Sequence, residues 1–319
     1  MPQSTHLTLK PTEDLSAKPS FDPNRPKDRF ESKAPTPCSP ISAICDGIHH
    51  VANALFFIYH SRMIKLRFLC STTLVFASFC GMASAESDVS PSLDRGEFSP
   101  FIRSLNVKPY GYTLISDPTG MAPAKQVERF EVRSGDCHFN GGWSDCERNR
   151  ERSELWEQGD RSPRGTSAWY GWSFFVPEDW PNVEPAKTVI GQFHQHRAHP
   201  IWMFLNHKGG LVLDDQSTGR STRSIPLIDE ANFTGRWHRI EVNGKWETDN
   251  TGFLKVWVNG KLKLDYSGQT MTADTVYFRF GVYRSFISRY KTKIGSELLP
   301  TQIAMFAKVR KAATREGLN

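Results

Sequence analysis

Hydrophobic and polar residues alternate in short runs from about residue 86 to the end of the chain. Runs of aromatic and β-branched residues are divided by Gly, Asn, Asp and Pro, a pattern typical of an all-β sandwich or barrel. No long helical period appears. The runs predict strands at 150–157, 167–176, 188–196, 201–206, 210–214, 236–246, 253–258, 261–266, 276–284 and 302–310. We therefore expect one all-β domain over residues 86–319.

The clearest local element is a hairpin between residues 253 and 266. Residues 253–258 read Phe-Leu-Lys-Val-Trp-Val and residues 261–266 read Lys-Leu-Lys-Leu-Asp-Tyr. Asn259 and Gly260 stand between them and can supply the positive φ angles of a type I′ turn. The pattern predicts two antiparallel strands joined by that turn.

Three of the predicted strands carry an unusual polar set on one face, because residues i, i+2 and i+4 of a strand point to the same side. The sets are Arg150, Arg152 and Glu154; Gln192, His194 and His196; and Tyr277, Arg279 and Tyr283. On the third strand the alternate residues are apolar, so that face should pack between two sheets while the polar face borders a groove. We expect the three sets to form the walls of one cleft.

A secretory signal peptide is predicted at residues 63–85. The segment has a basic start after Met63, an apolar stretch to Phe79, and Ala83-Ser84-Ala85 at its end, which are the three parts of such a peptide. The apolar stretch is short for a membrane span. We expect cleavage near Glu86 and no membrane association afterwards.

Residues 1–62 are rich in Pro, Ser, Lys and Asp. Because signal peptides stand at the start of a chain, the simplest interpretation is that Met63 is the true start and that residues 1–62 are an over-extended or disordered leader. The alternative is an internal membrane anchor with a disordered cytoplasmic tail.

Two of the six cysteines, Cys137 and Cys146, fall in the expected mature domain. An even pair in an exported chain, separated by a short loop, predicts a local disulfide. Metal ligation is the weaker interpretation, because His138 is the only further ligand nearby. The formal net charge of +6 falls to a small positive excess without the leader, so the clustering of charges tells more than their total.

Three motifs resemble, in order and spacing, those of alginate lyases of polysaccharide lyase family seven. They are Glu151-Arg-Ser-Glu-Leu155, Gln192-Phe-His194 and Tyr277-Phe-Arg-Phe-Gly-Val-Tyr283; the family reads Arg-Ser/Thr-Glu-Leu, Gln-Ile/Val-His and Tyr-Phe-Lys-x-Gly-x-Tyr. The surrounding sequence is similar to the broader group that includes glucuronan lyases and heparin lyase type I, notably at 191–195, 237–238 and the Asn-Gly hairpin. The resemblance covers most of residues 130–310, and three motifs in order are specific where any one is weak.

The resemblance implies a β-jelly roll, a concanavalin-like β-sandwich with a concave substrate groove, that cleaves a uronic-acid polysaccharide such as glucuronan or alginate by β-elimination. Removing the C5 proton builds negative charge on the adjacent carboxylate, so donors aimed at that carboxylate stabilise the transition state. By position in the motifs, Gln192 and Arg152 would supply them. A base must take the C5 proton and an acid must protonate O4, roles that fall to His194 and Tyr283. In this group the tyrosine is commonly the acid, and either the histidine or the same tyrosine is the base, which the sequence leaves open.

The other residues of the three sets are predicted to contact the substrate. Arg279 stands where the family has lysine, which keeps the charge and adds a bidentate fork for carboxylates. Glu154 either contacts substrate or orients Arg152 through a same-face ion pair. His196, with His199 beyond it, is either a groove residue or part of a solvated strand end and loop. Tyr277 and Arg150 complete the set.

Further residues have both a functional and a structural interpretation. Arg148, Arg150, Arg284 and Arg289 could extend a basic groove along an anionic chain, although scattered surface charge is the simpler interpretation for Arg148 and Arg289. Trp143 and Trp202 would stack on sugar rings or pack in the core.

Other reaction types find little support in the expected mature region. It has no Gly-rich phosphate loop, Gly-x-Ser-x-Gly elbow or His-Glu-x-x-His helix. Glu154 and Glu157 fall on opposite strand faces, so hydrolysis by a carboxylate pair is less favoured than elimination.

A non-catalytic carbohydrate-binding module is the second hypothesis. We expect a secreted or periplasmic monomer that binds an anionic polysaccharide and no nucleic acid. No organic cofactor is implied; a structural calcium ion stays open, although no carboxylate cluster stands out.

Overall fold

The computed structural model describes residues 93–319, apart from 105, 141, 160 and 220–222. The predicted leader at 1–62 and signal peptide at 63–85 lie outside the described residues. Within the described part, no helix is both long and apolar enough to cross a membrane.

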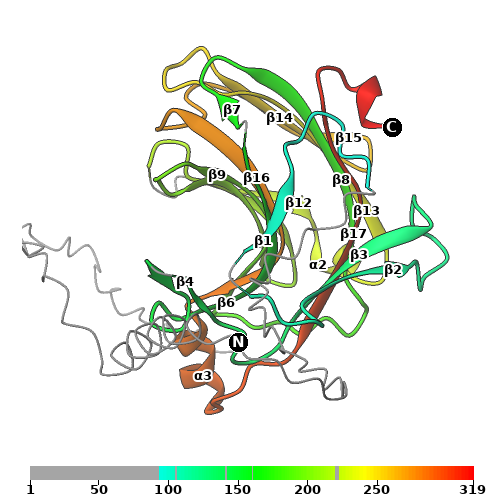
Figure 1. Ribbon diagram of the computed structural model, residues 1–319, viewed down its shortest axis with the longest axis vertical. Helices are drawn as coiled ribbons and strands as arrows, with labels where there is room; N and C mark the ends of the chain where they lie inside the picture. The colour runs from blue at the N-terminus through cyan, green and yellow to red at the C-terminus, as the bar shows by residue number, and fades with distance from the viewer. Residues whose placement is uncertain (1–92, 105, 141, 160, 220–222) are drawn as a thin grey trace, which may run out of the picture. The chain divides into compact units, whose positions relative to one another are not determined.

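Two antiparallel sheets pack face to face (Figure 1). The inner sheet has the order β1 (Phe101–Ser104), β6 (Arg150–Glu157), β16 (Thr275–Ser285), β9 (Lys187–Gln195), β10 (Pro200–His207), β11 (Gly210–Asp215) and β12 (Arg223–Ile228), with β7 (Ser162–Pro163) beside β16. The outer sheet has the order β15 (Lys261–Ser267), β14 (Phe253–Val258), β13 (Trp237–Lys245), β8 (Ser167–Phe175), β17 (Gln302–Ala312), β3 (Gln126–Val132) and β2 (Tyr112–Ser116). The predicted all-β jelly roll is confirmed as this sandwich.

Short elements join and flank the sheets. They are the two-stranded β4 (Phe139–Asn140) and β5 (Trp143–Ser144), the helices α2 (Glu230–Phe233) and α3 (Ile287–Ile294), and the 3₁₀ helix η1 (Glu316–Leu318). All the strands predicted from the sequence are present with closely matching bounds. The pattern missed β1, β2, β3 and β12 and the two-residue strands β4, β5 and β7. Strand β12 contains Pro226, which an edge strand tolerates because its outer N–H groups need no partner.

The predicted hairpin is β14 and β15. Val258 pairs with Lys261 across the turn, and Asn259 and Gly260 have φ angles of 49° and 77°. Both angles lie in the left-handed region that the type I′ turn requires. The Asn-Gly prediction is therefore confirmed.

The core lies between the two sheets and is rich in aromatic rings. Phe278, Phe280 and Val282 of β16 are fully buried, as their alternation predicts. Phe278 packs against Trp172 of the outer sheet with ring centroids 4.8 Å apart, and Phe280 packs edge-on against Phe306 at 5.3 Å. Each buried aromatic side chain contributes about 1.5–3 kcal/mol through burial, so β16 is firmly held on its apolar face.

An irregularity in the centre of the inner sheet sets the positions of the groove residues. The pairing of β9 shifts register against both β10 and β16 around Ile190, so Val189 and Gln192 face the same side although they are an odd number of residues apart. On β16, Gly281 has a φ of 131°. A Cβ there would lie 2.3 Å from the Ser153 carbonyl oxygen, so a side chain cannot be accommodated without moving β6.

Candidate functional site

A cavity of about 890 Å³ lies on the face of the inner sheet that points away from the outer sheet. In Figure 1 this sheet bends, and its hollow side is turned from the outer sheet. Alternating residues of β6, β9 and β16 line the cavity, as the same-face pattern predicted. The predicted site residues among them are Arg150, Arg152, Gln192, His194, Arg279 and Tyr283.

The lining has one sign of charge. Its cations are Arg103, Arg150, Arg152, Lys187 and Arg279, and none of the described lining residues is Asp or Glu. A cleft lined with one sign of charge raises the local concentration of an oppositely charged ligand. The cavity is therefore suited to an anionic ligand.

The remaining predicted site residues lie outside the lining. Glu154 is buried directly beneath it and Tyr277 is buried at its edge. His196 is exposed in the turn after β9 and does not line the cavity, whereas His199, the loop histidine, does.

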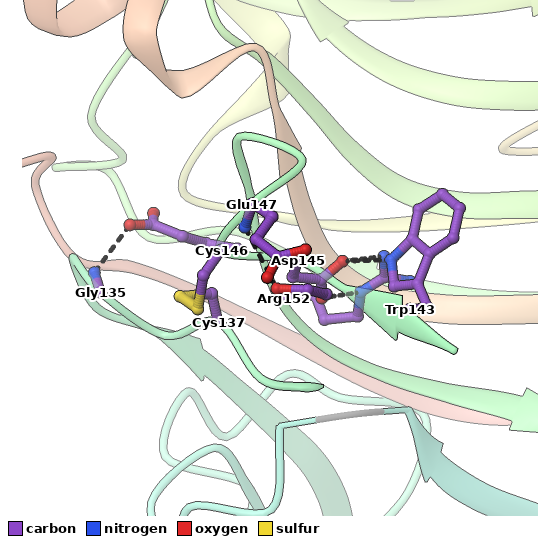
Figure 2. The surroundings of a disulfide bond; sticks show 9 residues. Gly135, Cys137, Trp143, Asp145, Cys146, Glu147 and Arg152 are labelled. Atoms are coloured by element: carbon purple, nitrogen blue, oxygen red, sulfur yellow. Dashed lines mark hydrogen bonds and ion pairs between the residues drawn. A yellow bond between two sulfur atoms is a disulfide. The ribbon is translucent and has the colours of Figure 1, made fainter. Parts of the chain in front are cut away.

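A chain of buried hydrogen bonds supports the floor of the cavity. The Gln192 amide donates from Nε2 to Oε1 of Glu154 at 2.7 Å, and Arg152 donates from Nη1 to the other oxygen of Glu154 at 3.2 Å. Arg152 also donates from Nε and Nη2 to the two oxygens of Asp145, each at 2.6 Å (Figure 2). This bidentate geometry fixes the plane of the guanidinium, and through Glu154 it fixes the Gln192 amide.

Arg152 keeps its charge although its side chain is only 5% exposed. Burial alone would lower its pKa, but the charge of Glu154 and the hydrogen bonds and charge of Asp145 outweigh that effect and raise the pKa. The guanidinium also lies 4.5 Å from the centre of the Tyr283 ring. Arg152 thus supports Tyr283, and two of its five N–H groups remain beyond the three donated to Asp145 and Glu154.

His194 is held as a neutral imidazole. Burial, followed by the charge of Arg279, lowers the pKa of His194 to about 3. Its Nδ1 lies 2.8 Å from the Gln195 carbonyl oxygen, and a carbonyl can only accept, so Nδ1 carries the proton. The lone pair is then on Nε2, which makes His194 a proton acceptor.

Tyr283 is held in its protonated form. Burial raises its pKa, and this effect exceeds the opposing influence of the Arg152 and Arg150 charges. The phenol oxygen accepts a hydrogen bond from Nε of Arg150. Its own O–H proton therefore remains available for donation, so Tyr283 can act as an acid.

Arg279 lies between these groups. It donates from Nη2 to the Tyr277 hydroxyl at 3.0 Å, and its Nη1 lies 3.9 Å from Glu154. Its buried Nε has no hydrogen-bond partner among the described residues. Because this N–H is buried and unpaired, it carries a desolvation cost of about 1–3 kcal/mol.

A model of the polysaccharide lyase family matches residues 95–300. The chain belongs to this family. The resemblance of the three motifs is thereby confirmed at family level, which favours an enzyme over a non-catalytic binding module.

Solved structures similar to this polysaccharide lyase include three uronate-polymer lyases. The endo-β-1,4-glucuronan lyase from the fungus Trichoderma reesei is 19% identical over 68% of this chain and 96% of its own, with a TM-score of 0.49. The alginate lyase from Pseudomonas aeruginosa is 17% identical over 65% of this chain and 87% of its own, with a TM-score of 0.43. The alginate lyase from Corynebacterium sp. is 16% identical over 67% of this chain and 93% of its own, with a TM-score of 0.44. No curated protein sequence matches the chain.

The polysaccharide lyase has the predicted disulfide between Cys137 and Cys146 (Figure 2). Next to it, Asp145 is fully buried and holds both Arg152 and the indole N–H of Trp143, the latter at 2.9 Å. The strand pattern did not indicate Asp145, because this residue lies in a loop. Its position beside a disulfide cysteine and upstream of the arginine strand was the available signal.

Two of the ambiguous sequence features of the polysaccharide lyase are structural. Arg284 was expected in a basic groove, but it is fully buried on the opposite face of β16, paired with Glu151. Strand alternation explains this, because Arg284 follows Tyr283 directly. Trp202 is a core residue whose Nε1 donates to the Thr270 carbonyl at 3.1 Å.

The other ambiguous features lie on or near the cavity edge. Trp143 lines the cavity and Arg148 lies over its ring, whereas Arg289 of α3 packs over the ring of Phe286, the residue before that helix. Within the described part of the polysaccharide lyase, no three or more His, Cys, Asp or Glu residues are grouped to hold a metal ion.

Proposed function

We propose that this polysaccharide lyase cleaves a uronic-acid polysaccharide by β-elimination in the cavity of the inner sheet. The observation that carries the proposal is the composition of the cavity wall, which combines several cations with no carboxylate among the described lining residues. Cations bind an anionic polymer. Hydrolysis of a glycoside usually needs two carboxyl groups flanking the bond, so this lining favours elimination.

The carboxylate of the reacting uronate would be bound at the floor of the cavity. Gln192 has a second amide hydrogen besides the one donated to Glu154, and Arg279, which lines the cavity, has Nη N–H groups besides the one donated to Tyr277. Arg152 contributes positive charge directly behind Tyr283. Donors that are already oriented stabilise the charge that develops on the carboxylate when C5 loses its proton.

The protonation states support one assignment of base and acid. His194 would accept the C5 proton on Nε2, the electrons of the C5–H bond would form the C4–C5 double bond, and the C4–O4 bond would break. Tyr283 would donate its proton to the departing oxygen. After product release, a proton returns from solvent to Tyr283 and His194 loses one, which restores both groups.

The decisive experiment follows the unsaturated product. Purified protein is incubated with glucuronan, alginate and an uncharged polysaccharide, and the ultraviolet absorbance of the unsaturated uronate is recorded beside reducing ends. At least one polyuronate should yield both signals and the uncharged polymer neither. Reducing ends without absorbance would show hydrolysis and overturn the proposal.

The pH profile provides a second prediction. The base must be deprotonated, and the pKa of His194 lies far below its usual value, so kcat/KM should not fall on acidification through pH 6.5. The acid must be protonated, and burial raises the pKa of Tyr283 above the usual value of a tyrosine, so activity should be lost only at strongly alkaline pH. Because kcat/KM reports the free enzyme, its profile between pH 5 and 11 checks both limits. A falling limb centred near pH 6.5 would contradict the assignment of His194.

The disulfide also bears on the location of the protein. Disulfides persist mainly in oxidising compartments, which supports the export predicted from residues 63–85. N-terminal sequencing of the protein released by its cells should find a start near Glu86, and peptides from residues 1–62 would contradict this.

A further inference from the structure

Trp143 is a large aromatic residue that lies at the border of the cavity and not in the core. It lies on β5, in a short hairpin whose ends are joined by the Cys137–Cys146 disulfide, and it lines the cavity. The residue is 37% exposed. Its indole N–H donates to the buried Asp145, which fixes the plane of the ring. An aromatic ring is thus held rigidly at the border of the cavity.

Two arginines accompany this ring. The Arg148 guanidinium lies 4.2 Å from the ring centre of Trp143, and that of Arg150 lies 5.5 Å from it. Neither forms an ion pair with a carboxylate of the described residues. The Arg150 guanidinium donates to the Tyr283 hydroxyl and to the Arg148 backbone carbonyl, and the Arg148 guanidinium lies over the Trp143 ring. Both charges are therefore available to an anionic ligand.

We propose that Trp143, Arg148 and Arg150 form a separate subsite that binds one further uronate unit of the polymer. The inference rests on the proposed function and deepens it. Arg148 lies over the Trp143 ring, and the part of the indole that stays exposed would pack against the C–H groups of a sugar ring while the arginines reach the carboxylate at the edge of that sugar ring. Arg150 also donates to Tyr283, so the subsite borders the position where the bond breaks.

A subsite of this kind strengthens the binding of long oligomers and leaves the binding of short ones unchanged. A short substrate held only between His194 and Tyr283 does not extend to the border of the cavity where Trp143 lies, whereas a longer chain gains the stacking contact and the carboxylate contact. Aromatic stacking contributes about 0.5–1.5 kcal/mol, which corresponds to about a two- to twelve-fold change in affinity. The disulfide and Asp145 lower the entropic cost of binding because the ring is already oriented.

The test compares chain lengths with Trp143→Ala. Affinities for oligouronates of increasing length are measured by calorimetry on a Tyr283→Phe background, which separates binding from turnover. We expect Trp143→Ala to weaken the binding of the longer oligomers by about tenfold and that of the shortest bound oligomer by less than about twofold. Equal losses at all lengths, or no loss at any length, would overturn the subsite.

Two further variants isolate the contribution of the ring. Trp143→Phe keeps an aromatic face but loses the N–H bonded to Asp145, so it should retain the advantage of long oligomers. If it binds them as weakly as Trp143→Ala does, the indole acts only through Asp145 and the proposal is wrong. Phe139→Ala is the matched control, because Phe139 is 58% exposed on the same hairpin and does not line the cavity. A wild-type protein that binds oligouronates with this length dependence but cleaves none would contradict the proposed function alone.

Discussion

Replacing Tyr283 by phenylalanine is expected to lower kcat by about 10²–10⁴-fold, the usual contribution of a positioned proton donor, and to change KM only a few-fold. The aromatic ring, which packs beside Val189 and Met203 and over Arg152, is preserved. The lost hydroxyl accepts one hydrogen bond, from Arg150, so folding stability should fall by about 1 kcal/mol. Steady-state kinetics on the polyuronate cleaved by the wild type measure the effect.

A matched control for this substitution is Tyr112→Phe. The Tyr112 hydroxyl donates to Glu128 at 3.1 Å, and burial raises the pKa of Tyr112 as it does that of Tyr283, but Tyr112 does not line the cavity. Loss of the Tyr112 hydroxyl in Tyr112→Phe should leave kcat unchanged. If Tyr283→Phe also keeps the wild-type kcat, Tyr283 is not the acid.

A histidine variant then separates the two assignments of the base. If His194 accepts the C5 proton, His194→Asn should lose turnover by a similar factor. If Tyr283 serves as both base and acid, His194→Asn should keep most of its turnover. A neutral His194 and a protonated Tyr283 favour the first result.

The parts of the site that could be predicted from the sequence are those that follow a regular strand. On β16, Arg279 and Tyr283 face the cavity while Phe280 and Val282 face the core, as period-two alternation requires. The same alternation places Arg284 on the core face, so the sequence already contained the evidence against a groove role for Arg284.

The irregular parts could not be predicted in this way. The register shift around Ile190 changes which β9 residues meet Tyr283, and nothing in the local sequence except Gly191 marks it. Asp145 was missed for a related reason, since its contacts with Arg152 depend on how the loop folds back. Loop geometry is set by the disulfide and by backbone hydrogen bonds, such as that from Arg152 to the Asp136 carbonyl at 3.0 Å, and a side-chain pattern does not encode these.

Removing Asp145 should have the largest effect on stability of any single change in this site. Asp145→Ala leaves the Arg152 guanidinium buried with only Glu154 as a charge partner, and breaking a buried ion pair costs about 3–5 kcal/mol. The Trp143 indole also loses its acceptor. Asp145→Asn keeps the side-chain volume and one acceptor oxygen, so its loss should be smaller. Urea unfolding measures the free energy of unfolding of both variants.

The control for Asp145 is Glu147→Ala, which removes an exposed carboxylate directly after the disulfide cysteine Cys146 and should change the stability by less than about 0.5 kcal/mol. Turnover distinguishes support of the fold from support of the site. Because Asp145 orients Arg152, which in turn holds Glu154 and faces the Tyr283 ring, folded Asp145→Asn should lose kcat more than KM. The contrary result would be an Asp145→Ala variant whose unfolding midpoint in urea equals that of the wild type. Asp145 would then not compensate the Arg152 charge, and the buried hydrogen bonds that link Trp143, Asp145, Arg152, Glu154 and Gln192 would not support the cavity floor.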